Sequence, residues 1–137
     1  MSSVYDDIRE ALEVKLSNTS NLPSQIAWEN VKFSPTTGTA YLETRLVPTT
    51  RRPSVRGLNP QMRYDGFYRV LVYVPENQGP AVADGYANTL IEAFEATTDL
   101  SANGTFVSIE YAERAQGITQ SPWYYVPVEI GWYTYAK

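Results

Sequence analysis

The stretch that decides the fold is GFYRVLVYVPENQGPAVADGYANTLIEAF, at residues 66–94. It begins with an apolar-rich run over 67–74 that ends at Pro75, because proline lacks the backbone donor that a sheet needs. After a short polar turn, Pro80 suits the first position of a helix, where its missing N–H costs nothing. From Val82 the apolar spacing changes from two residues to about 3.6. The stretch therefore predicts a long strand, a sharp turn and a helix folded back on its own sheet.

Apolar residues at helical spacing predict two helices. In the central stretch the stripe consists of Val82, Tyr86, Leu90 and Phe94. A second stripe near the N-terminus repeats every four residues, at Val4, Ile8, Leu12 and Leu16. Ser2 or Ser3 can cap this N-terminal helix, and the polar run at 18–21 predicts its end. Both helices are amphipathic and are expected to bury their stripes against a sheet.

Alternating apolar and polar residues predict further strands on both sides of the central stretch. The candidates lie at 25–30, 40–47, 105–111 and 124–135. With the central strand they give the order α-β-β-β-α-β-β. We therefore expect an α+β fold, with a mainly antiparallel sheet of four to five strands and two helices packed on one face. The length predicts a single domain over residues 1–137.

Residues 48–65, PTTRRPSVRGLNPQMRYD, predict a long loop between the second and third strands. Four arginines stand against Asp65 alone, which gives this segment a net charge of +3, while the whole chain has −4. The arginines are Arg51, Arg52, Arg56 and Arg63. Arginine without lysine favours planar, bidentate recognition of carboxylates or phosphates. We expect the segment to contact a partner, and a simple exposed loop and direct recognition of nucleic acid are the alternatives.

The composition argues against catalysis. The chain has no histidine and no cysteine, which excludes disulfides, thiolate metal sites and every Ser-His-Asp scheme. The carboxylates form no recognisable pair with a base or metal partner, so we expect no enzyme activity, no metal and no cofactor. The acidic balance disfavours non-specific binding of duplex DNA. No signal peptide or run of membrane-spanning length occurs, so we expect a soluble protein made in a cytoplasm, with no membrane partner.

The aromatic C-terminal segment SPWYYVPVEIGWYTY, at residues 121–135, has two interpretations. Tyr124, Tyr133 and Tyr135 are candidates for a subunit interface, because tyrosine is common at protein contacts. The same rings, together with the arginines, are also typical of single-strand nucleic-acid binding. Acidic helices and one basic segment on the same chain favour head-to-tail packing of copies into a ring.

The order of elements and the signature GFYRVLVYVPENQGP at 66–80 resemble the tail terminator (tail completion or minor tail) proteins of long-tailed bacteriophages. The resemblance continues through Phe94, the run Val107-Ser108-Ile109 and the final-strand run PVEI at 127–130. It covers nearly the whole chain. The last strand is richer in tyrosine than the family pattern requires.

The resemblance implies a structural ring protein, commonly a hexamer, at the head-proximal end of the tail in the virion. Such a ring caps the tail-tube protein, ends tube polymerisation and presents a surface to the head connector or neck protein. The four arginines would then lie on a projecting loop or line the lumen, where genomic DNA passes. Two alternatives stay open: a head-completion or neck adaptor protein, and a single-strand nucleic-acid-binding module.

Overall fold

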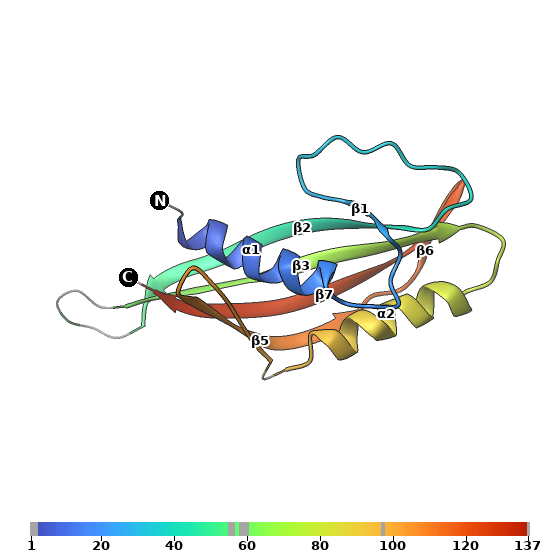
Figure 1. Cartoon of the computed structure of the whole chain (residues 1–137). Helices are drawn as coiled ribbons and strands as arrows, with labels where there is room; N and C mark the ends of the chain where they lie inside the picture. Colours follow the sequence, from blue (N-terminus) through green and yellow to red (C-terminus); the bar gives the residue numbers. More distant parts are fainter. Residues whose placement is uncertain (1–2, 55–56, 58–60, 97, 137) are drawn as a thin grey trace.

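The computed structural model describes residues 3–54, 57, 61–96 and 98–136. Across these residues the chain forms two helices and seven strands (Figure 1). The helices are α1 (Val4–Ser17) and α2 (Ala81–Ala93). The strands are β1 (Gln25–Ala27), β2 (Tyr41–Pro53), β3 (Met62–Pro75), β4 (Asp99–Ala102), β5 (Thr105–Arg114), β6 (Ile118–Gln120) and β7 (Trp123–Ala136).

All seven strands belong to one sheet in the order β1-β2-β3-β7-β5-β4, and β6 pairs with the start of β7. The long strands β2, β3, β7 and β5 are antiparallel neighbours, whereas β1 runs parallel to β2. The sheet is strongly curled, and both helices lie on the same side of it (Figure 1). This arrangement leaves the other face of the central strands without a helix.

The predicted sheet of four to five mainly antiparallel strands, in the order α-β-β-β-α-β-β, is wrong. The sheet is mixed and has seven strands in the described chain, in the order α-β-β-β-α-β-β-β-β. The additional strands, β4 and β6, contain four and three residues, which is too short to show an alternating pattern. The strands β1 and β2 are parallel, so a long connection and not a tight hairpin turn joins them. Local turn signals in the sequence therefore do not predict this pairing.

The predicted long loop at 48–65 is also wrong, because most of it is a hairpin. β2 continues to Pro53 and β3 begins at Met62, with a register shift between Pro48 and Thr50. Backbone hydrogen bonds extend this hairpin although the side chains of its β2 half, at 48–53, are exposed. Pro48 and Pro53 are tolerated because β2 has an open edge on the side away from β3, where no donor is required. Figure 1 shows the hairpin projecting beyond the helices.

The core lies between the helices and the covered face of the sheet. On α1, Ile8, Leu12 and Leu16 are buried as the spacing predicted. On α2 the buried side chains are Ala83, Ala87, Leu90 and the following Phe94, whereas Val82 is 45% exposed. The α2 stripe is thus rotated relative to the prediction, because small alanines allow the helix to pack closely on the sheet. The sheet contributes the predicted inward residues of β7: Val126, Val128, Ile130 and Trp132.

Two sets of polar contacts hold α1 in place. Ser3 and Asp6 form a capping box at its N-terminus. The buried carboxylate of Asp7 accepts hydrogen bonds from Asn103 Nδ2 at 3.0 Å and Thr105 Oγ1 at 2.8 Å. These bonds tie the first turn of α1 to the β4–β5 hairpin. Neither helix in the described residues is long and apolar enough to cross a membrane.

Candidate assembly surface

The face of the sheet opposite the helices, here called the open face, is built by strand alternation. Because the β3–β7 register is continuous, residues of both strands stand in rows across this face. The paired positions are Arg63 with Tyr135, Asp65 with Tyr133, Phe67 with Gly131, Arg69 with Glu129, Leu71 with Pro127 and Tyr73 with Tyr125. The open face therefore mixes aromatic rings with charged side chains.

Arg63 is the centre of a cluster at the hairpin end of the open face. Its Nη1 donates to Tyr135 Oη at 2.8 Å, and its Nε donates to Asp65 Oδ1 at 3.0 Å. The guanidinium carbon lies 4.3 Å from the centre of the Tyr133 ring, within cation–π range. Burial lowers the pKa of Arg63, but the hydrogen bonds to Tyr135 and Asp65 outweigh burial and raise the pKa above its ordinary value. The structure thus brings together one predicted arginine and two predicted tyrosines.

The predicted arginines do not form one patch. Arg51 Nε donates to Tyr64 Oη at 3.0 Å, and the Tyr64 ring packs edge-on against Tyr5 of α1, so Arg51 belongs to the helix side. Arg52 is exposed and is paired in register with Arg63. Arg56 lies outside the described residues. The basic segment is therefore divided between the two faces of the hairpin.

Tyr124 is separated from the other two predicted tyrosines. It lies near the start of β7, pairs with Thr119 of β6, and packs half-buried against the core. A Cβ added to Gly117 would overlap the Tyr124 ring, so this glycine leaves the space that the ring fills. Tyr124 is on the helix side, whereas Tyr133 and Tyr135 are on the open face.

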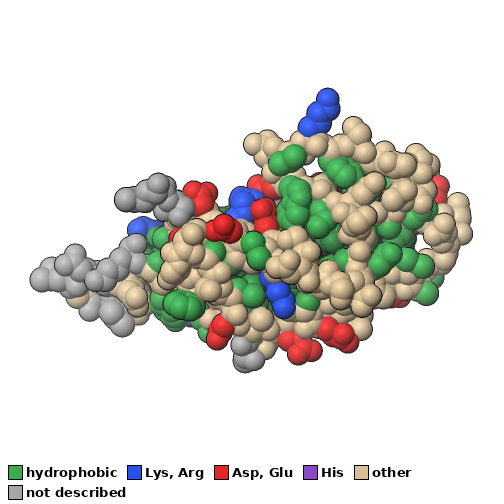
Figure 2. All heavy atoms as spheres, in the orientation of Figure 1, with side chains coloured by type: hydrophobic (Ala, Val, Ile, Leu, Met, Phe, Trp, Pro, Cys, Tyr) green, Lys and Arg blue, Asp and Glu red, His purple; other side chains and the backbone are tan. Residues whose placement is uncertain are grey.

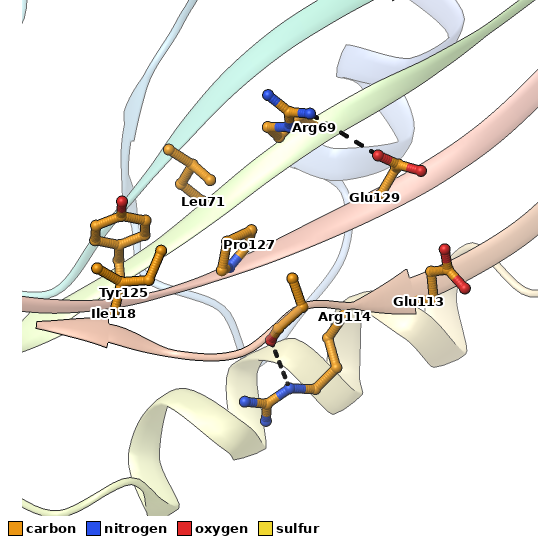
Figure 3. Close-up of a pocket in the computed structure, with 9 residues that line it drawn as sticks. Arg69, Leu71, Glu113, Arg114, Ile118, Tyr125, Pro127 and Glu129 are labelled. Atoms are coloured by element: carbon orange, nitrogen blue, oxygen red, sulfur yellow. Dashed lines mark hydrogen bonds and ion pairs between the residues drawn. The ribbon is translucent and has the colours of Figure 1, made fainter.

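The middle of the open face holds a hollow of about 380 Å³ (Figure 3). Arg69 and Glu129 face each other across it, with N and O atoms 3.9 Å apart. Leu71, Pro127 and Tyr125 supply apolar lining, and Glu113 and Arg114 of β5 complete the wall. Charges of both signs above an apolar floor suit contact with another polypeptide.

Tyr111 closes the β5 side of this region. Gly131 is opposite Tyr111 in register, and a Cβ at this glycine would overlap the Tyr111 ring. The ring lies across the glycine, and its hydroxyl donates to Glu129 Oε2 at 2.8 Å. Burial, together with that hydrogen bond to a carboxylate, raises the pKa of Tyr111 to about 12. The phenol therefore stays a donor throughout the physiological range.

At the far end of the open face, aromatic rings form a second cluster that sequence reasoning missed. Tyr41 stacks on Tyr73 with ring centres 4.6 Å apart, and Trp123 meets Tyr41 edge-on at 5.1 Å. Phe33 adds a ring from the segment before β2, and Tyr125 adds one from β7. The aromatic residues at odd-numbered positions of β3 and β7 indicate that their rings share one face of each strand. Only the β3–β7 register shows that these rings are neighbours. These contacts cover this end of the sheet, leaving the Tyr133 end more accessible.

The arrangement supports association better than chemistry. The described residues contain no group of three or more His, Cys, Asp or Glu side chains that could hold a metal ion. Arg63, Asp65, Arg69 and Glu129 of the open face are already paired with neighbours. Its aromatic rings are partly exposed, Tyr135 by 44%. Tyrosine and arginine held in fixed positions are typical of the residues that dominate protein interfaces.

Comparison with known proteins points to one family. The sequence model of the phage tail terminator protein family matches residues 7–132. One solved structure, 26% identical in sequence, superposes with a TM-score of 0.73 over 95% of this chain and 94% of that chain. Another, from the virion of a native gene transfer agent particle, is 13% identical, with a TM-score of 0.65 over 99% of this chain and 100% of that one. No curated protein sequence matches.

Proposed function

Given that this chain belongs to the phage tail terminator family, and is thus a structural tail protein of a virion, we propose that it forms the ring that caps the tail tube. The ring ends polymerisation of the tube protein and offers its other side to the head connector. This places the protein at the head-proximal end of the tail. The resemblance of the sequence to terminator proteins predicts six copies in the ring.

The observation that carries the proposal is the prearranged open face. Arg63, Asp65, Tyr133 and Tyr135 are held by one another before any partner arrives. A surface whose side chains are already ordered loses less conformational entropy on binding, which favours permanent assembly. Because Arg63 is engaged within the chain, the cluster supports a protein-contact surface better than a phosphate-binding one.

The test is polymerisation of purified tail-tube protein with and without this chain, with tube lengths measured by electron microscopy. We expect tubes to shorten as the ratio of this chain to tube protein rises, with extra density at one end only. An unchanged length distribution would contradict capping. Capture of a connector protein without any effect on tubes would instead favour the adaptor alternative.

A matched pair of variants locates the surface. Tyr133→Ser combined with Tyr135→Ser alters the open face, whereas Val14→Ser alters an exposed position on α1, where Val14 is 51% exposed. We expect the tyrosine variant to lose capping and the Val14 variant to keep it. If the tyrosine variant also fails to form rings, the surface joins subunits, as the sequence predicted; if rings persist, it contacts the tube.

A further inference from the structure

The two edges of the curled sheet carry opposite charges. Beyond Glu43, where pairing with β1 ends, β2 has three arginines and no carboxylate, at Arg45, Arg51 and Arg52. At the other edge, α2, β4 and β5 span residues 81–114, which hold six carboxylates and one arginine, a net charge of −5. The strand order places β2 and the β5–β4 pair on opposite sides of the sheet.

The charge also changes sign in one row across the open face. The registers align Arg45 of β2, Arg69 of β3, Glu129 of β7 and Glu113 of β5. Two positive positions are thus followed by two negative ones, perpendicular to the strands. A charge distribution of this kind gives each subunit one attractive surface on each side.

The basic edge favours side-chain contacts over addition of a strand. On the open side of β2, the Leu46 backbone N–H is already bound by Glu29 Oε1 at 2.8 Å. Pro48 and Pro53 have no N–H to offer. A partner strand would therefore find few donors, which is how proteins protect exposed sheet edges. The exposed side chains of Arg45 and Arg52 are what this edge offers to a partner on the open face. Arg51, whose Nε is bound to Tyr64, adds its charge on the helix side.

The acidic edge carries an exposed aromatic as well as charge. Phe106 of β5 is 70% exposed, and the carboxylates Asp99, Glu110 and Glu113 on β4 and β5 are exposed. In Figure 2 acidic side chains stand along the lower margin, on the side of α2 and β5. No strand pairs with β5 beyond Ile109 on the side away from β7 in the described chain. An aromatic ring beside carboxylates is suited to arginine-bearing surfaces.

We propose that the basic edge of β2 in one copy docks on the acidic edge of α2, β4 and β5 in the next copy. The docking partner is a second copy of this chain, because each subunit carries both the basic edge and the acidic edge. Such a contact uses two different patches and is heterologous, so repetition closes a ring when the rotation permits. This inference rests on the proposed ring function and assigns its subunit interface.

The test uses two charge-reversal variants with three substitutions each. One is Arg45→Glu, Arg51→Glu and Arg52→Glu on the basic edge. The other is Glu95→Lys, Glu110→Lys and Glu113→Lys on the acidic edge. Each variant, with tail-tube protein present, is examined by native mass spectrometry at low salt, alone and in an equimolar mixture. Val14→Glu, at an exposed position of α1 outside both edges, is a control that adds charge.

We expect each variant alone to stay monomeric, because both of its edges then have the same sign. In the mixture every junction again joins opposite charges, so rings with alternating copies form; this restoration also shows that both variants fold. Rings from either variant alone, or no ring from the mixture, would overturn the assignment of the two edges as the subunit interface. If the wild-type chain still forms rings in that experiment, the proposed function stands. No ring from the wild-type chain with tube protein would overturn both.

Discussion

The guanidinium of Arg63 lies over the ring of Tyr133, 4.3 Å from its centre, and joins the turn end of the β2–β3 hairpin to the end of β7. The same guanidinium bonds to Tyr135 and Asp65. One side chain thus fixes the direction of a hairpin that extends past the helices.

Replacing Arg63 with alanine should lower the free energy of unfolding by about 1–3 kcal/mol, because a charge-assisted hydrogen bond and a cation–π contact are lost together. Arg63→Lys should recover only part of this loss, since an ammonium cannot reproduce the planar contacts. Urea unfolding gives the values. Arg52→Ala, directly opposite on β2, is the matched control and should change stability by less than about 0.5 kcal/mol. Equal losses for both positions would refute the role given to Arg63.

Gly131→Ala should destabilise the protein by about 1–3 kcal/mol, because the new methyl group occupies the place of the Tyr111 ring. The double variant Gly131→Ala with Tyr111→Ala should lose less than the sum of the two single changes. Thermal unfolding measures each. Gly85→Ala is the control: it lies in α2 with open space around it, and alanine there should stabilise by about 0.5–1 kcal/mol. Additive losses at Tyr111 and Gly131 would show that the ring does not lie over the glycine.

Asp7→Ala should cost about 1–3 kcal/mol, because the buried Asp7 carboxylate and its hydrogen bonds from half-buried Thr105 and exposed Asn103 are lost, while Asn103 keeps Glu10 as an acceptor. Hydrogen exchange should then show faster opening of the β4–β5 hairpin than of β3. Thr105→Val removes only one of the two bonds and should cost roughly half as much. If β3 and the β4–β5 hairpin exchange at the same rate in Asp7→Ala, the hydrogen bonds of Asp7 do not stabilise the hairpin in particular.

Stability should fall below about pH 4, partly through Glu29. Burial raises the pKa of Glu29, but the hydrogen bonds from Arg9 and the Leu46 N–H outweigh it, so the pKa in the folded state is lowered. Because its pKa is lowered by folding, ionised Glu29 stabilises the folded protein at pH values above its pKa in the unfolded chain, about 4.3. This stabilisation is lost as the pH falls through the pKa of Glu29 in the folded state. Glu29→Gln should therefore flatten the acid side of the stability–pH curve. A curve that falls as steeply as in the wild type would assign the acid sensitivity to other carboxylates.

Much of the fold was readable because apolar periodicity is local. The spacing of Ile8, Leu12 and Leu16 and the alternation from Val126 to Trp132 required only neighbouring residues, and these side chains are buried as expected. β4 and β6 were missed because a few residues with polar side chains carry no period. The sequence predicts a loop at 48–65 and not a hairpin, because the pairing depends on backbone groups, which exposed arginines and threonines do not reveal.

The candidate surface was harder to predict because it depends on register. Arg63 and Tyr135 were both selected from the sequence, yet only the β3–β7 alignment makes them partners. Tyr124 was grouped with Tyr133 and Tyr135 by composition, but its odd spacing from both places it on the other face of β7. The same limit applies to the charged edges: the sequence indicated acidic helices and a basic segment, but only the strand order shows that β2 and the β5–β4 pair lie on opposite sides of the sheet.

In the proposed function, this chain assembles into a closed ring on the tail tube. The most direct measurement is mass in solution by light scattering over a concentration series, first alone and then with tail-tube protein. We expect one discrete multiple of the mass of the 15.4 kDa chain, either alone or when the tube protein is added. A monomer under both conditions, at every concentration, would contradict it.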